Sequence, residues 1–154
     1  QGPNNSQPAF TPLESDSASS SVTPPTSTAP AAEPDINRVQ VEELADHALI
    51  HFPYNSTRKE EDAAIDAYLS RLARQLIDGG GTVTLTGHTD NVGDSKTNEA
   101  FALRRAKNIR DLLIKKGVAK KQIVCKSYGE RKPIASNDHP KGRYQNRRVE
   151  IRVK

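Results

Sequence analysis

Residues 81–94 read G-T-V-T-L-T-G-H-T-D-N-V-G-D, and the change halfway along this stretch decides the fold. Its first half alternates apolar residues with threonine, which is typical of a half-buried strand. Its second half gathers a histidine, two aspartates, an asparagine and glycines. Such residues are typical of a turn and also of a binding site, because sites are often built on loops at strand ends.

A helix is predicted to follow this loop. It runs from about Thr97 to Lys116, and Gly117 stands at the C′ position, where glycine commonly ends a helix. The apolar residues recur at helical spacing and are Phe101, Ala102, Ala106, Ile109, Leu112 and Leu113. The sequence therefore predicts a strand, a polar loop and a helix in direct succession.

The flanking segments extend this unit into a small domain. Residues 46–56 alternate as a strand does, and residues 57–78 carry apolar residues at helical intervals. Residues 122–130 and 148–153 also alternate, and residues 131–146, which hold two prolines, are predicted to form a loop. The order β-α-β-α-β-β predicts an α+β, two-layer sandwich with the helices packed on one face of a small mixed sheet.

The first part of the chain has a different composition. Residues 1–34 hold seven prolines, seven serines and four threonines. Such a segment has too little apolar surface to offset the entropy of ordering it. We therefore predict a disordered linker over 1–34 and a folded domain over 35–154.

The domain is basic. The chain has 23 Lys and Arg against 19 Asp and Glu, and three of the acids lie in the linker, which leaves 23 against 16, a net charge of +7. This charge suits a polyanion, a membrane surface or an anionic wall polymer. Nucleic acid is not an expected partner, because the domain has few aromatic residues for base stacking and no nucleic-acid motif.

Several classes of site are excluded. Cys125 is the only cysteine, so an intrachain disulfide and a Cys-rich zinc site are ruled out. His47, His51 and His139 stand apart, so neither a metal site nor a cofactor is expected. Because the chain begins at Gln1 and has no methionine, we expect a mature or trimmed fragment that reaches a membrane only through an anchor upstream.

Arg105 and Asp90 are the charged residues that need an explanation. Arg105 shares the apolar side of its helix or its border, and Asp90 lies on the loop that feeds the same helix. From the residues alone, two interpretations stay open: an ion pair that ties loop to helix, or an open pair that binds a ligand of both charges. His88 and Asp90 share a strand face, but no nucleophile accompanies them, which favours a packing role for His88 over a catalytic one.

Four motifs in order carry a resemblance to a known family. They are T-G-H-T-D-N-V-G-D at 86–94, N-E-A-F-A-L-R-R-A-K-N-I at 98–109, S-Y-G-E-R-K-P-I-A-S-N at 127–137 and N-R-R-V-E-I-R-V at 146–153. With them, residues 46–154 resemble the OmpA-like C-terminal domain family, which includes the peptidoglycan-associated lipoproteins and the wall-binding domain of the flagellar stator. The resemblance implies a noncatalytic domain that binds peptidoglycan through the diaminopimelate of its stem peptide.

The resemblance also implies a set of binding residues. Asp90 matches the aspartate that holds the diaminopimelate amino group, and Arg105 matches the arginine that holds its carboxylate. Asn98 resembles a site asparagine, and Arg147 resembles a further arginine at the pocket rim. This chemistry suits the residues, because a carboxylate and a guanidinium complement a group that carries an ammonium and a carboxylate.

Two further positions depart from the family pattern. Val92 stands where many members have threonine, so only a backbone contact carries over there. Asn55 belongs to Y-N-S, which stands where the family has F-D-x-N-S, and it is the weaker candidate for the pocket wall.

The resemblance implies a place in the cell as well. We expect the domain in the periplasm of a diderm bacterium, associated with the outer membrane, where it anchors an envelope protein to the wall. The linker, about 30 to 35 Å across as a flexible coil, would act as a tether. The alternatives are an interaction module for another envelope protein and a wall-processing enzyme. The sequence leaves a homodimer open.

Overall fold

The computed structural model describes residues 35–56 and 63–154, and the chain divides into a unit of residues 1–35 and a unit of residues 36–154. The linker predicted over 1–34 and the start of the helix predicted from residue 57 lie outside the described residues. In order, the elements are β2 (Gln40–Glu43), β3 (Ala48–His51), α1 (Ala63–Gly79), β4 (Val83–His88), α2 (Ser95–Lys115), the 3-10 helix η4 (Lys120–Gln122), β5 (Ile123–Gly129), α3 (Pro140–Asn146) and β6 (Arg148–Val153).

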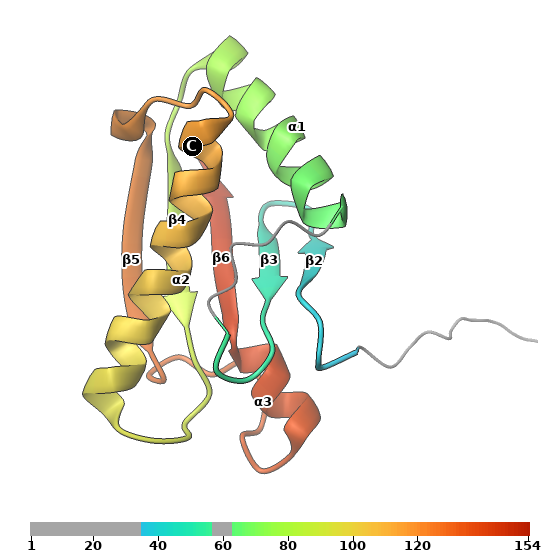
Figure 1. Ribbon diagram of the computed structural model, residues 1–154, viewed down its shortest axis with the longest axis vertical. Helices are drawn as coiled ribbons and strands as arrows, with labels where there is room; N and C mark the ends of the chain where they lie inside the picture. Colours follow the sequence, from blue (N-terminus) through green and yellow to red (C-terminus); the bar gives the residue numbers. More distant parts are fainter. Residues whose placement is uncertain (1–34, 57–62) are drawn as a thin grey trace, which may run out of the picture. The chain divides into compact units, whose positions relative to one another are not determined.

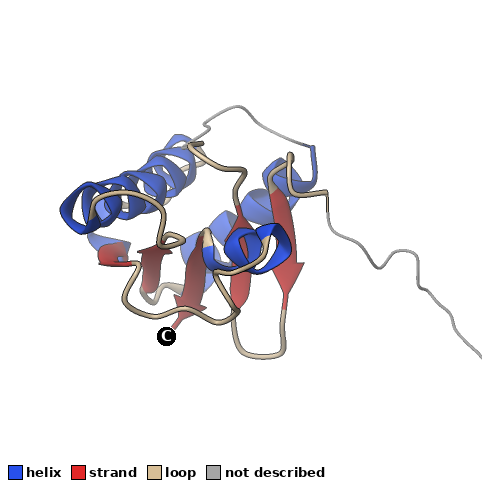
Figure 2. Cartoon of the chain, turned by 90° about the horizontal axis from the view of Figure 1, so that it is seen from below, coloured by secondary structure: helices blue, strands red, loops and turns tan. Residues whose placement is uncertain are grey.

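The strands form one mixed sheet in the order β2-β3-β6-β4-β5. β4 and β5 pair in parallel, and the other neighbours pair antiparallel. The long helices α1 and α2 lie on the same face of the sheet (Figures 1 and 2). The predicted α+β class with helices on one face is therefore confirmed.

The core lies between this face and the two helices. Alternate residues of the central strands point into it, among them Ile50, Leu85 and Ile151, because successive side chains of a strand point to opposite faces. The helices meet them with residues at helical spacing, namely Ile65, Leu69, Leu72, Leu76, Ala106, Ile109, Leu112 and Leu113. The apolar residues of the strands and helices thus form a single buried layer.

Three elements were not predicted: β2, the short η4 and α3. β2 reads Q-V-E-E and carries a single apolar residue, so no alternation marks it; it forms because it pairs with β3 across a short turn. α3 lies in the segment predicted as a loop. It has seven residues, begins at Pro140 and buries Tyr144 and Asn146, so it is too short to show a helical period.

The close packing of α2 on β4 depends on Gly87. A Cβ atom at Gly87 would lie 1.9 Å from the backbone carbonyl oxygen of Ala102, so no other residue fits there without moving the helix. The helix begins at Ser95, slightly before the predicted start, because the Asp94 side chain caps it by accepting a hydrogen bond from the Thr97 amide at 2.9 Å. The close packing at Gly87 and the Asp94 cap together hold the end of β4, the loop and the start of α2 in place.

Candidate functional site

A pocket of about 170 Å³ lies where the segment after β3, the β4–α2 loop and α2 meet. Each of the six residues predicted for the site lines this pocket: Asn55, Asp90, Val92, Asn98, Arg105 and Arg147. They come from four separate parts of the sequence. The fold therefore brings together the residues that the motifs singled out, while their binding of a ligand stays a prediction.

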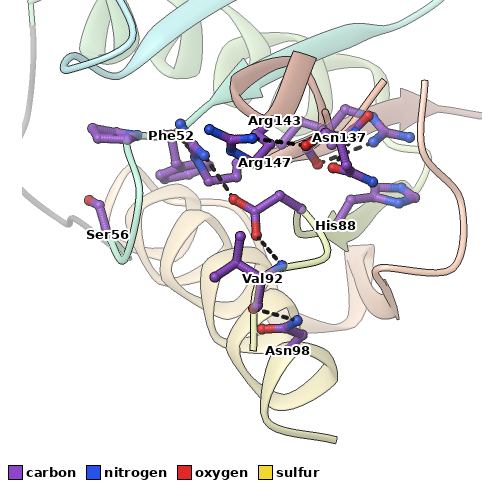
Figure 3. A network of polar contacts seen from close by, with 12 residues as sticks. Phe52, Ser56, His88, Val92, Asn98, Asn137, Arg143 and Arg147 are labelled. Carbon is purple, nitrogen blue, oxygen red and sulfur yellow. Dashed lines mark hydrogen bonds and ion pairs between the residues drawn. The ribbon is translucent and has the colours of Figure 1, made fainter. Parts of the chain in front are cut away.

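Asp90 is buried at the floor of the β4–α2 loop, with 3% of its surface exposed. One carboxylate oxygen, Oδ2, accepts a hydrogen bond from Nη1 of Arg147 at 2.8 Å, and the other, Oδ1, accepts one from the Val92 amide at 3.1 Å (Figure 3). The ion pair that the sequence suggested between Asp90 and Arg105 is thus replaced by one between Asp90 and Arg147. β6 lies beside β4, which puts Arg147 at the same end of the sheet as Asp90.

Arg147 is a buried wall of the pocket and not an exposed residue of its rim. Besides Asp90, its side chain donates from Nε to the Phe52 carbonyl at 2.9 Å. The Phe52 amide in turn donates to the Arg147 carbonyl at 2.8 Å. The guanidinium thus connects the Asp90 loop to the end of β3, and it neutralises the carboxylate that it touches.

Arg105 has only 1% of its surface exposed. Its guanidinium donates to three backbone carbonyls, at 2.8 Å from Nε to Ser56, 3.2 Å from Nη1 to His88 and 3.4 Å from Nη2 to Pro53. It also lies over the rings of Phe52 and Phe101. Within residues 35–56 and 63–154, no carboxylate forms an ion pair with it.

The electrostatics of Arg105 reflect this position. Burial lowers its pKa to about 9, the positive charge of Arg147 adds to the effect, and Asp90 opposes it. A guanidinium has five N–H groups, and the described residues engage three of those of Arg105. The pocket therefore contains a buried cation with donors to spare.

Hydrogen bonds of Asn98 and Val92 hold the β4–α2 loop in place. Nδ2 of Asn98 donates to the Val92 carbonyl at 3.0 Å (Figure 3) and to Glu130 Oε1 at 2.9 Å. The Val92 amide is held by Asp90, while its side chain is 42% exposed. Both backbone groups of Val92 are thus engaged inside the loop. Two amides at the start of α2 are engaged as well, because those of Thr97 and Asn98 donate to Asp94.

Asn55 lies on the turn after β3. This turn is distant from the β4–α2 loop in the sequence, but both line the same pocket. Its φ angle of 61° falls in the left-handed region, which asparagine tolerates better than most residues. Its neighbour Tyr54 also lines the pocket and is 62% exposed. Sequence reasoning missed Tyr54, because an isolated aromatic residue after a strand carries no periodic signal.

Thr89 is a second pocket residue that the sequence did not single out. Its Oγ1 atom is buried and has no hydrogen-bond partner among the described residues. The backbone amide donates to the Gly129 carbonyl at 2.9 Å. No sequence signal distinguishes this threonine from those of the strand that precedes it.

His88 does not line the pocket. Its ring is buried and stacks on Tyr128 at 5.7 Å between centroids. Burial lowers its pKa to about 4, and the charges of Arg148 and Lys132 add to this against the opposing charge of Glu150. The imidazole is neutral at neutral pH, which agrees with the packing role.

Other parts of the described chain offer no comparable site. The described residues contain no group of three or more side chains able to hold a metal ion, and none of their helices is long and apolar enough to cross a membrane. A larger hollow of about 630 Å³ lies by the β2–β3 turn and the end of β6. Its polar lining residues are exposed or half-buried, including the ion pairs Arg71–Glu43 and His47–Asp46, so the hollow has no buried polar group that calls for a ligand.

Comparison with known proteins identifies the family of the chain. Residues 52–147 match the family model described as OmpA family. The peptidoglycan-associated lipoprotein of Pseudomonas putida is 36% identical over 104 residues, which cover 66% of this chain and 60% of that protein. The chain spans 60% or less of the length of the first curated relatives that it matches.

Solved structures give the same result. The crystal structure of the peptidoglycan-associated lipoprotein from Burkholderia pseudomallei has a TM-score of 0.64 and 27% identity, over 69% of this chain and 89% of that one. The cell wall anchor of the T6SS from Pseudomonas aeruginosa has a TM-score of 0.56 and 30% identity, over 75% of this chain and 87% of that one. Because the family model matches more than half of its length, the chain belongs to the OmpA family.

Proposed function

We propose that this domain binds peptidoglycan without catalysis, by holding the diaminopimelate of the stem peptide in the pocket. The observation that carries the proposal is Arg105, a buried cation that lines an open pocket and whose only hydrogen-bond partners among the described residues are backbone carbonyls. Burying a charge without an ionic partner is costly. An anionic ligand group that completes the site would recover part of that cost.

The pocket also suits the second charge of the ligand. The free end of diaminopimelate carries an ammonium and a carboxylate on one carbon atom. Asp90 uses one acceptor position on each oxygen, and an ionised carboxylate has about four. The ammonium is therefore assigned to Asp90 and the carboxylate to the remaining donors of Arg105, with Arg147 holding Asp90 in place.

The relatives support the biological setting. One is named a peptidoglycan-associated lipoprotein and another a cell wall anchor, both of which are names for proteins that attach to the wall. For this chain we propose a periplasmic location and attachment of an envelope protein to the wall, with residues 1–34 as the tether. Repeated sites on a polymer make a weak affinity per site sufficient for such attachment.

Sedimentation with isolated wall sacculi tests the proposal. Asp90→Asn removes the negative charge, and Arg105→Lys removes the fork of donors of the guanidinium. We expect each substitution to lower the affinity about tenfold or more. Arg104→Lys and Asp138→Asn are the matched controls, since both residues are exposed and neither lines the pocket. Circular dichroism of each variant checks that it is folded.

The same experiment separates the alternatives. If folded Asp90→Asn and Arg105→Lys variants pellet as strongly as the wild type, the site assignment is wrong. An interaction module would bind its protein partner equally well with either substitution. A wall-processing enzyme would release new fragments from purified muropeptides, which mass spectrometry detects.

A further inference from the structure

The pocket is too small for more than the end of a wall fragment. Its volume is about 170 Å³, whereas pockets that enclose a drug-sized ligand measure about 300 to 1,000 Å³. It can hold the amino acid head group of a diaminopimelate side chain. The remainder of the polymer must leave the pocket and lie across its rim.

Tyr54 is the most exposed large apolar side chain of the described residues, and it lines this pocket. The other three tyrosines each have a partner: Tyr68 lies under Arg71, Tyr128 stacks on His88, and Tyr144 stacks on His51. Among the described residues, the ring of Tyr54 has neither a ring partner nor a cation over it. A flat aromatic face is therefore available beside the pocket.

The turn that carries Tyr54 is held firmly. The Ser56 amide donates to the Pro53 carbonyl at 3.3 Å, and Asn55 between them has a positive φ angle. Arg105 donates to the carbonyls of both Pro53 and Ser56. The arginine of the pocket thus also fixes the turn, and an aromatic ring on a rigid turn loses little conformational entropy when it binds.

We propose that Tyr54 forms a saccharide subsite next to the pocket, where its ring stacks on a pyranose of the glycan strand. The inference rests on the proposed function, because it takes the ligand to be peptidoglycan. A pyranose presents a flat face of C–H groups, which matches the electron-rich face of a tyrosine ring. The stem peptide next to the diaminopimelate offers small methyl groups and carboxylates, which cover much less of such a ring.

Calorimetry with two matched ligands tests the subsite. One ligand is the stem tripeptide that ends in diaminopimelate, and the other is the same tripeptide attached to its disaccharide. We expect the wild type to bind the disaccharide compound about fivefold to tenfold more tightly. Tyr54→Ala should remove this difference, while Tyr54→Phe should keep it.

The control is Ile134→Ala, because Ile134 is also an exposed large apolar residue but does not line the pocket. Equal loss for both ligands in Tyr54→Ala would mean that the ring contacts the peptide, and the saccharide subsite would be refuted. A wild type that does not distinguish the two ligands refutes it as well. A wild type that binds neither ligand contradicts the proposed function itself, and the subsite with it.

Discussion

Arg147 and Asp90 form a buried ion pair, which we expect to contribute to the stability of the fold. A buried carboxylate that loses its partner is left without compensation, which typically costs about 3 to 5 kcal/mol. We therefore expect Arg147→Met to lower the free energy of unfolding by about that amount in urea titrations. Arg152→Met, on the strand that follows Arg147 but half exposed, should stay within about 0.5 kcal/mol of the wild type.

A double variant sharpens this prediction. Combining Arg147→Met with Asp90→Asn removes the unpaired charge, so the double variant should be more stable than Arg147→Met alone. If Arg147→Met is as stable as Arg152→Met, the ion pair does not contribute as described.

His88 gives the fold a pH dependence. Its pKa is about 4 in the folded chain against an ordinary value of 6.5, so the unfolded chain binds a proton more readily. The stability that the neutral ring provides is present above pH about 6.5 and is lost as the pH falls toward about 4, by roughly 2 to 3 kcal/mol. His88→Phe keeps a ring for Tyr128 and should lack this component in urea titrations at several pH values. Parallel pH profiles for the two proteins would contradict the assignment.

The contact between β4 and α2 is the element pair on which the site depends. Gly87→Ala would drive a Cβ atom into the Ala102 carbonyl, and we expect the overlap to cost at least about 3 kcal/mol in thermal or urea unfolding. Gly79→Ala is the control, because nothing lies within 4 Å of a Cβ atom there and its φ angle is ordinary. Equal stability of the two variants would show that α2 can move without cost.

These elements also show what a sequence can and cannot reveal. The strand, loop and helix around Asp90 were predictable because their apolar periods and the glycine after the helix are local features, whereas the Asp94 cap was not predicted. The partner of Asp90 was not, since Arg147 lies 57 residues away and meets it only through the pairing of β4 with β6. The backbone carbonyls that accept hydrogen bonds from Arg105 could not be predicted for the same reason, because they lie far from it in the sequence. β2 and α3 are held by their neighbours and carry too little apolar pattern of their own.

At the scale of the whole molecule, charge and pocket have separate roles in the proposed function. A net charge of +7 over residues 35–154 attracts anionic polymers in general, and such attraction weakens as salt rises. It speeds encounter more than it selects a partner. Selection is left to the pocket, where a carboxylate and a guanidinium from different elements face one small volume.

Titration of the chain with two stem tripeptides tests this central claim most directly. One tripeptide ends in diaminopimelate, and the other ends in lysine, which keeps the ammonium but lacks the carboxylate assigned to Arg105. Calorimetry should show binding of the diaminopimelate peptide and at least about tenfold weaker binding of the lysine peptide. Equal affinity for the two peptides would contradict the role of Arg105 and the account built on it.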